Sequence, residues 1–329
     1  MRFLKKPQID VPAEQIFKEC VDRYIGRSKD EKAKNKALRE KLHKCDDLVQ
    51  ADSKNYQQKI RSGSYTISDL PADVTPDDMA NVYSQIFTKK NPVQTYYRII
   101  RGEPYYAKCP ICGSRNVKKH LDHYLPKSKF PTLCVTPDNL VPICSACNEE
   151  KRTYYSLDAE TRPFHLYFDK DCLPLVDGDY GEKYQEIFLR AEIAQDYHIM
   201  FQTDHPAHRT AVLRKRLDKH VEIYGLLKRY EECVDPDIAQ LWCDWQDKIL
   251  KVLKDDPELI RTEQMESDIL QDLISEQVYK YRRLPNTWES ALFRAMKAQS
   301  DTIYTWFKDN EREIRKAVQK HCSTDPDEE

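Results

Sequence analysis

Two Cys-x-x-Cys pairs constrain this chain more than any other feature of its sequence. Cys109 and Cys112 form the first pair, and Cys144 and Cys147 form the second. A Cys-x-x-Cys turn directs both of its sulfurs at one ion, and two such turns complete the tetrahedral thiolate shell of a structural Zn²⁺ site. The segment between the pairs is too short for a separate domain, but it is long enough for a hairpin and a loop. We therefore predict a zinc ion bound by these four cysteines, whose binding contributes free energy to folding.

The segment between the pairs also carries the residue types that phosphodiester hydrolysis requires. His123 has a side chain that can accept a proton near neutral pH. Asp122 offers an anionic oxygen to a divalent cation, and Asn148, which directly follows the last cysteine, offers a neutral amide oxygen. Mg²⁺ is usually held beside a phosphate by few protein ligands and several waters. The pattern indicates a hydrolytic site next to the zinc.

The same residues resemble the HNH nuclease family, which has the ββα-metal fold. The resemblance is carried by a D-H-x-x-P run at 122–126, an N-L-x-x-x-C run at 139–144 and a C-N-x-x-K ending at 147–151. It covers about 45 of 329 residues and implies little about the remainder. A zinc ribbon without catalysis is a common use of four cysteines, and the Asp-His pair and Asn148 at the family's positions favour the nuclease.

The resemblance implies a role for each matching residue. His123 would be the general base that deprotonates the attacking water, while Asp122 and Asn148 would hold one Mg²⁺ or Mn²⁺ at the scissile phosphate. Asn139 would tie the loop after the first strand so that His123 is correctly aimed. The third letter of the motif is His in many members and is Asn148 here, as in other members. Lys151 would share a helix face with Asn148 and could contact a phosphate.

The predicted module carries a local excess of positive charge. Between Lys108 and Lys129 the sequence has six basic residues and one acid, although the whole chain has a net charge of −2. Such a patch is typical of contacts with a phosphate backbone. We predict that nucleic acid is bound by the module's lysines, Lys118, Lys119, Lys127, Lys129 and Lys151.

Composition favours a mainly α protein. Only 7 of the 329 residues are Gly, and strands and tight turns consume glycine. Seven further cysteines form no disulfide framework, the start has no apolar signal segment, and no apolar run is long enough to span a membrane. These features predict a cytoplasmic protein without membrane contact.

The expected fold class is mainly α with a small α+β module, a zinc-stapled ββα-metal module between helical domains. We predict a helical domain at 1–104, the nuclease module at 105–160, a small strand-containing connection at 161–205 and a helical domain with an acidic tail at 206–329. A helix is expected from Asp10, its N-cap, to Tyr24, and another begins at Thr75-Pro76. Strands are expected at 140–143, at 163–169 and on both sides of residues 195–196. Helices are expected at 145 onwards, 207–230, 236–254, 257–281 and 287–320.

The expected function is metal-dependent hydrolysis of DNA, most simply double-stranded DNA. Analogy with HNH proteins that carry large helical extensions implies a bacterial defence nuclease, controlled by an ATPase or another sensor subunit. Two alternatives stay open at this point. One is a zinc-stapled nucleic-acid-binding or adaptor protein whose catalysis has lapsed, and the other is an RNase of the same fold.

Overall fold

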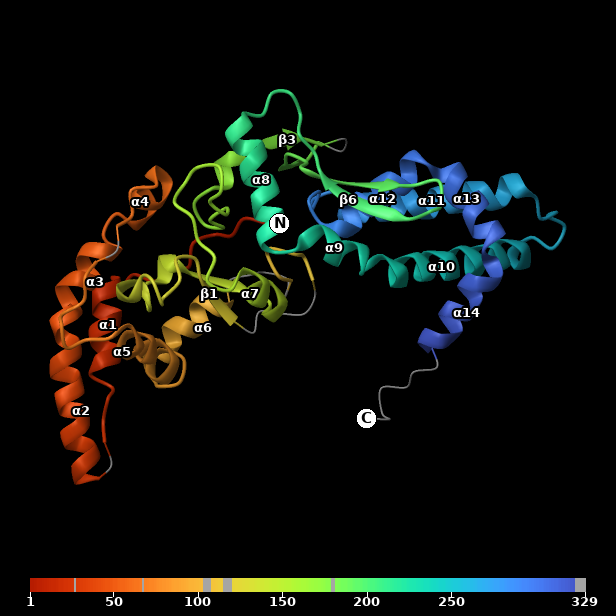
Figure 1. Ribbon diagram of the computed structural model, residues 1–329. Coiled ribbons are helices and arrows are strands. Elements are labelled where there is room, and N and C mark those ends of the chain that lie inside the picture. Colours follow the sequence, from red (N-terminus) through yellow and green to blue (C-terminus); the bar gives the residue numbers. More distant parts are fainter. Residues whose placement is uncertain (27, 67, 103–107, 115–119, 179–180, 323–329) are drawn as a thin grey trace. The chain divides into compact units, whose positions relative to one another are not determined.

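The protein is mainly helical, with three small antiparallel hairpins. The computed structural model describes residues 1–26, 28–66, 68–102, 108–114, 120–178 and 181–322 (Figure 1), with side chains to residue 316. Its contacts divide the chain into two compact units. Unit 1 comprises residues 1–172 and 209–224, and unit 2 comprises residues 173–208 and 225–329. The predicted division into four domains places its borders elsewhere and stays a prediction.

The first part of unit 1 is helical, as the sequence predicts. Its elements are α1 (Ala13–Val21), α2 (Lys29–Leu42), η1 (His43–Cys45), α3 (Asp46–Ser53), α4 (Tyr56–Ser62), α5 (Pro76–Asn81), η2 (Val82–Phe87) and α6 (Gln94–Gly102). Two of these helices begin with capping boxes, Ser28 with Glu31 and Thr75 with Asp78. In each box the hydroxyl and the carboxylate satisfy amide groups that the first helical turn leaves free.

Two details of these helices differ from the prediction. Helix α1 takes Pro12, not Asp10, as its N-cap, with extended backbone at that residue. Proline presets φ near −65° and has no N–H to leave unpaired, so it suits a helix start without a side-chain cap. The second detail is that η2, which continues α5, is a π-helix. Its buried residues include the expected Val82, Ile86 and Phe87.

The zinc-binding segment forms one hairpin followed by one helix. Strand β1 (His120–His123) pairs antiparallel with β2 (Leu140–Ile143), so that Asp122 is opposite Val141 and His123 is opposite Leu140. The connection contains two short 3₁₀ turns, η3 (Pro131–Leu133) and η4 (Pro137–Asn139). Helix α7 (Ser145–Lys151) follows β2 directly. Both β2 and the start of α7 lie where the sequence places them.

One hydrophobic core joins the hairpin to the preceding helices. Ile16, Phe17 and Cys20 of α1 and Phe87 of η2 belong to the same buried cluster as Leu121 and Leu140 of the hairpin. The connection contributes Cys134 and Val135 to this cluster. A hairpin of two four-residue strands buries too little apolar surface to be stable alone. The helices of residues 1–102 therefore act as the foundation of the hairpin within unit 1.

The segment 163–169 is not the strand that its alternation predicts. It is a buried turn, in which the amides of Phe168 and Asp169 donate to the carbonyl of His165. The Asp169 carboxylate in turn accepts from the His165 amide and from Arg216 of α8 (Ala211–Ile223). These local side-chain acceptors replace the hydrogen bonds that a strand partner would provide.

Unit 2 combines two hairpins with a helical array. Its strands are β3 (Leu175–Asp177) paired with β4 (Lys183–Gln185), and β5 (Leu189–Ile193) paired with β6 (Ile199–Thr203). Its helices are α9 (Leu226–Glu231), α10 (Val234–Asp255), α11 (Glu263–Tyr281), α12 (Trp288–Ala298), α13 (Ser300–Asp309) and α14 (Glu311–Cys322). The β5–β6 hairpin lies around residues 195–196 as predicted, and β5 packs on α12 (Figure 1).

The predicted long helices of unit 2 and its border are interrupted. The expected helix 207–230 is split between α8 and α9 at Gly225, which has a φ of 55°. The expected helix 287–320 is three helices, broken at Gln299 and at Asn310. The described part of the chain has no helix that is long and apolar enough to cross a membrane.

Candidate active site

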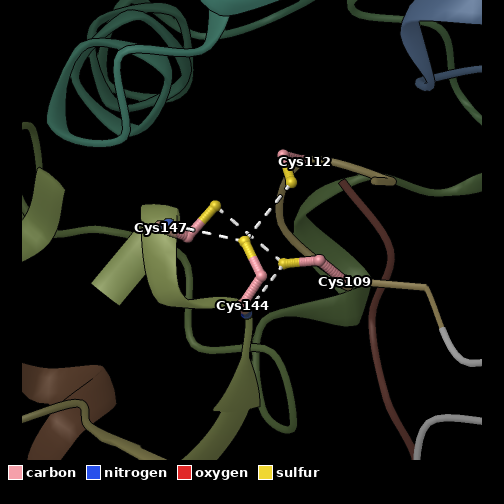
Figure 2. Close-up of side chains that lie close together, drawn as sticks. All are labelled: Cys109, Cys112, Cys144 and Cys147. Atoms are coloured by element: carbon pink, nitrogen blue, oxygen red, sulfur yellow. Dashed lines mark hydrogen bonds between the residues drawn. The ribbon is translucent and has the colours of Figure 1, made fainter. Parts of the chain in front are cut away.

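Four cysteine sulfurs meet at one point in unit 1 (Figure 2). Cys109 and Cys112 come from the turn before the hairpin, while Cys144 is the N-cap of α7 and Cys147 lies in its first turn. All four sulfurs lie within 4.8 Å of one another, with 3.9 Å between Cys109 and Cys147 and 3.7 Å between Cys112 and Cys144. A tetrahedral ion with Zn–S bonds of about 2.3 Å would hold its sulfurs about 3.8 Å apart.

The surroundings of the cluster suit thiolates. All four cysteines are buried, and backbone amides donate to two sulfurs, the Cys144 amide to Cys109 and the Cys147 amide to Cys144. Hydrogen bonds among the four thiols lower the pKa of Cys112 and Cys144, with Cys109 as the largest contributor, and raise the pKa of Cys109 and Cys147. Thiolates are the form that binds a metal. The donor set therefore fits a closed structural zinc site, and it is the one such group of His, Cys, Asp or Glu among the residues described.

The His123 ring, at the end of β1, is held in one orientation. Its Nε2 lies 2.9 Å from the carbonyl oxygen of Cys134 in the connecting loop. A carbonyl can only accept, so Nε2 carries the proton and Nδ1 keeps the free lone pair. The ring of Tyr83 packs edge-on against the imidazole, with 4.5 Å between the ring centroids. The orientation is thus fixed by the loop on one side and by η2 on the other.

The environment of His123 keeps the imidazole neutral. Burial lowers its pKa from 6.5 to about 3, while the hydrogen bond to the Cys134 carbonyl opposes this shift. The residue is only 9% exposed. A neutral imidazole with a free Nδ1 has the protonation state of a general base at pH 7.

Asn139 braces the loop that follows β1. Its Oδ1 accepts from the Leu125 amide at 2.8 Å, and its Nδ2 donates to the Leu125 carbonyl at 3.0 Å. The Tyr56 hydroxyl, from α4, donates to the same Oδ1 at 2.7 Å. The side chain is fully buried and contacts no His123 atom by hydrogen bond. Asn139 therefore fixes the backbone two residues beyond His123 and leaves the imidazole to the Cys134 carbonyl.

Asp122 lies beside His123 on β1 and is paired with Lys151, the last residue of α7. The Lys151 Nζ is 3.0 Å from each carboxylate oxygen and 2.9 Å from the His123 carbonyl oxygen. Both side chains are buried, that of Lys151 completely. Burial raises the pKa of the Asp122 carboxyl, and the Lys151 ammonium opposes the rise. The position differs from the one the sequence suggests for Lys151, which is a surface contact with phosphate.

Asn148 lies one turn before Lys151 on α7 and is partly exposed. Its backbone belongs to the helix, and its side-chain amide forms no hydrogen bond with any described residue. Residues three apart share a helix face, so the amide is on the side of α7 that meets Asp122 through Lys151. Carboxylate and amide oxygens are ligand types that Mg²⁺ or Mn²⁺ accepts, although both oxygens of Asp122 are bound by Lys151 in this structure.

The surface lysines are only partly visible in the described chain. Lys127 is half-buried and Lys129 is exposed, both in the loop after β1. Lys118 and Lys119 lie outside the described residues. The binding of nucleic acid by these four lysines stays a prediction.

Sequence reasoning missed two neighbours of His123. Tyr83 was overlooked because it lies beside the apolar stripe of its helix, and only the π-helical turn brings it to the imidazole. The Cys134 carbonyl was overlooked because a backbone group leaves no mark on the sequence. The four-residue spacing from Cys147 to Lys151 could have revealed that Lys151 faces the core, since Cys147 is fully buried.

The hairpin and the helix form one module, in which four cysteines fit a zinc site and the first strand carries Asp122 and His123 in succession. Residues 109–153 match the family model described as HNH endonuclease, and this segment is an HNH endonuclease domain. Over 234 residues the chain is 24% identical to protein ea31 of Escherichia phage lambda, an alignment that covers 70% of this chain and 74% of that protein. No solved structure matches the chain.

Proposed function

We propose that the protein is a metal-dependent endonuclease that hydrolyses phosphodiester bonds of DNA. The observation that carries the proposal is His123, a buried neutral imidazole whose Nε2 proton is held by the Cys134 carbonyl and whose Nδ1 is free. Asp122 precedes it on β1 and gives the same site a carboxylate. The HNH match of residues 109–153 supports nuclease chemistry at this position.

The proposed mechanism assigns one task to each side chain. The Nδ1 of His123 accepts a proton from a water molecule, the water oxygen attacks phosphorus, and the bond to the 3′ oxygen breaks while that oxygen takes a proton from solvent water. The products are a 5′-phosphate and a 3′-hydroxyl. Asp122 and Asn148 would hold Mg²⁺ or Mn²⁺, which supplies stabilisation of charge on the phosphate and the leaving oxygen. A positioned base is commonly worth about 10²–10⁴ in rate.

The remaining residues act as supports. Asn139 and Tyr83 fix the loop and the ring that determine where Nδ1 points. Zinc on the four cysteines would join the hairpin, which carries Asp122, to α7, which carries Asn148. Lys127 and Lys129 would attract the phosphate backbone.

The test is cleavage of supercoiled plasmid by the full chain with Mg²⁺ or Mn²⁺, and with EDTA. We expect nicked or linear product with the divalent ion and none with EDTA or in the His123→Ala variant. Parallel single-stranded DNA, duplex DNA and RNA substrates identify the nucleic acid that is cut. Binding without cutting under all conditions would show an adaptor, and cutting of RNA alone would show an RNase.

We also propose that cutting is controlled by a partner within a bacterial defence system. The support is that unit 2 carries none of the predicted site residues. Unit 2 would therefore have a regulatory role. Affinity purification of the tagged chain from its host, followed by activity measurement with and without the copurified protein, tests this part. Full activity of the isolated chain and no stoichiometric partner would contradict it.

A further inference from the structure

Lys151 is the most completely buried cationic side chain in the described part of unit 1. Its side chain has no exposed surface, although lysine is almost never fully buried unless it is paired. Three oxygen atoms surround Nζ at 2.9 to 3.0 Å. Two are the carboxylate oxygens of Asp122, and the third is the carbonyl oxygen of His123. All three belong to the two residues that form the proposed reaction centre.

These contacts occupy the atoms that a divalent cation would need. A cation on Asp122 must take at least one carboxylate oxygen, and Nζ lies at hydrogen-bond distance from both. Two cations that crowd one buried carboxylate repel each other strongly, because the interior screens charge poorly. The ammonium and the metal ion therefore compete for Asp122.

We propose that Lys151 is a resident counter-cation of Asp122 that a divalent ion must displace before the site can work. This inference rests on the proposed function, in which Asp122 is a metal ligand. Lys151 is a positioning residue here: it keeps the carboxylate compensated and oriented in the metal-free protein, and it lowers the affinity for the metal. When the metal ion displaces Lys151 from Asp122, the ammonium is released within one helical turn of Asn148. It could then make the phosphate contact that the sequence predicts for Lys151.

The test measures Mn²⁺ binding to the zinc-loaded full chain by electron paramagnetic resonance, without substrate. In Lys151→Met the side chain keeps its approximate length and loses its charge. We expect the Kd for Mn²⁺ to fall by about tenfold or more, because the incoming ion alone then neutralises the buried carboxylate. We also expect a lower thermal midpoint without added Mn²⁺ and a larger rise of the midpoint when Mn²⁺ is added.

Two further variants make the result decisive. Lys127→Met removes one charge from the same module without touching Asp122, and an equal fall in Kd there would show a general charge effect and overturn the inference. Lys151→Arg retains a cation and should bind Mn²⁺ as weakly as the unaltered chain; it also serves if Lys151→Met fails to retain zinc. Unchanged or weaker Mn²⁺ binding in a folded Lys151→Met protein would likewise overturn it.

The variant Asp122→Asn separates the two proposals. We expect it to weaken Mn²⁺ binding by at least about tenfold in the unaltered chain and in Lys151→Met. If Asp122→Asn weakens binding while Lys151→Met does not strengthen it, the counter-cation role alone is wrong. If Asp122→Asn leaves binding unchanged, the metal-ligand role of Asp122 in the proposed function is wrong as well.

Discussion

The burial of His123 limits its strength as the proposed general base. A pKa of about 3 keeps the imidazole neutral at pH 7, so its lone pair is available to accept a proton. The same low pKa makes it a weak proton acceptor until charge develops on the water it faces. Contacts that orient the ring therefore matter as much as its proton affinity. These contacts come from one backbone carbonyl and one aromatic ring.

Removing the imidazole should stop cutting while leaving the domain folded. We expect His123→Ala to lower the cleavage rate by about 10²–10⁴ because no other described side chain can take its place at the end of β1. Leaving the Cys134 carbonyl without its donor should cost about 1–3 kcal/mol of stability. Plasmid cleavage, zinc content and thermal midpoint are the measurements.

The matched control is His120→Ala, on the same strand but exposed. It should retain zinc and most of the cleavage rate. Equal losses in the two variants would contradict the assignment of His123 as the base.

His165 should make unit 1 sensitive to mild acid. Burial lowers its pKa from 6.5 to about 3, and a hydrogen bond to the Asp138 backbone opposes this shift. Below pH 6.5 the unfolded chain binds a proton at this residue, and the folded chain does not. The free energy of unfolding is therefore at its full value above pH 6.5 and decreases as pH falls from 6.5 towards 3. Between pH 7.5 and 5.5 this histidine should cost about 1 kcal/mol of unfolding free energy.

Urea titration of His165→Asn at the two pH values tests the assignment. Asparagine offers an acceptor to the Tyr167 amide, which donates to the Nδ1 of His165, and it does not titrate. The variant should lose less stability on acidification than the unaltered chain. Equal losses would show that His165 is protonated in the folded state or is not the source.

At the scale of elements, α7 is the part on which the site depends most. It begins at the second cysteine pair and contains Asn148 and Lys151, yet it is only seven residues long. Isolated helices of this length are not stable in water. We therefore infer that the metal-bound cysteines, together with the packing of Lys151 on Asp122, keep α7 folded.

Substituting one zinc ligand should consequently remove activity at a distance. Cys147→Ser is expected to lower zinc content from about one equivalent to none, to reduce the thermal midpoint and to abolish cleavage, because the structural ion contributes folding free energy. Zinc is measured by metal analysis of the purified protein. Cys233→Ser, at an exposed position in unit 2, is the control and should keep both zinc and activity. Retained cleavage in zinc-free Cys147→Ser would contradict the dependence.

The sequence predicted those elements whose signals are local. Strand β2, the start of α7, the cap at Thr75 and the hairpin β5–β6 depend on neighbouring residues, and the structure has them in place. The segment 163–169 misled the prediction because its alternating apolar residues are buried in a turn that Arg216 completes from α8. The pairing of Lys151 with Asp122 was missed for a related reason: it joins residues 29 apart, and only the packing of α7 on β1 reveals it.

At the scale of the whole molecule, the two units have opposite charges. Unit 1 contains 35 Lys and Arg against 25 Asp and Glu, a formal charge of +10. Unit 2 contains 18 against 30, a formal charge of −12, and the two sum to the net −2 of the chain. Overall neutrality thus conceals a basic unit that carries the HNH domain and an acidic unit that would repel a phosphate backbone.

Nucleic-acid binding should therefore respond to charge in unit 1 alone. We expect the double variant Lys127→Gln, Lys129→Gln to weaken duplex DNA binding and to reduce the slope of log K against log salt concentration by about 1–2. The matched control is Lys251→Gln with Lys254→Gln, two exposed residues of α10. Fluorescence anisotropy at several salt concentrations measures both. An equal change of slope in the control would contradict a binding surface on unit 1.

The position of α8 in the sequence has a consequence for folding during synthesis on the ribosome. Arg216 bonds to Asp169 and to the Pro163 carbonyl, and the His220 Nδ1 accepts from the Phe164 amide, so the turn beside the HNH domain stays open until α8 is synthesised. Residues 173–208, which belong to the other unit, are synthesised before α8. A nascent chain at that stage would carry all four cysteines and His123 but lack these α8 contacts, so we expect the proposed nuclease site to be completed only after α8 has been synthesised.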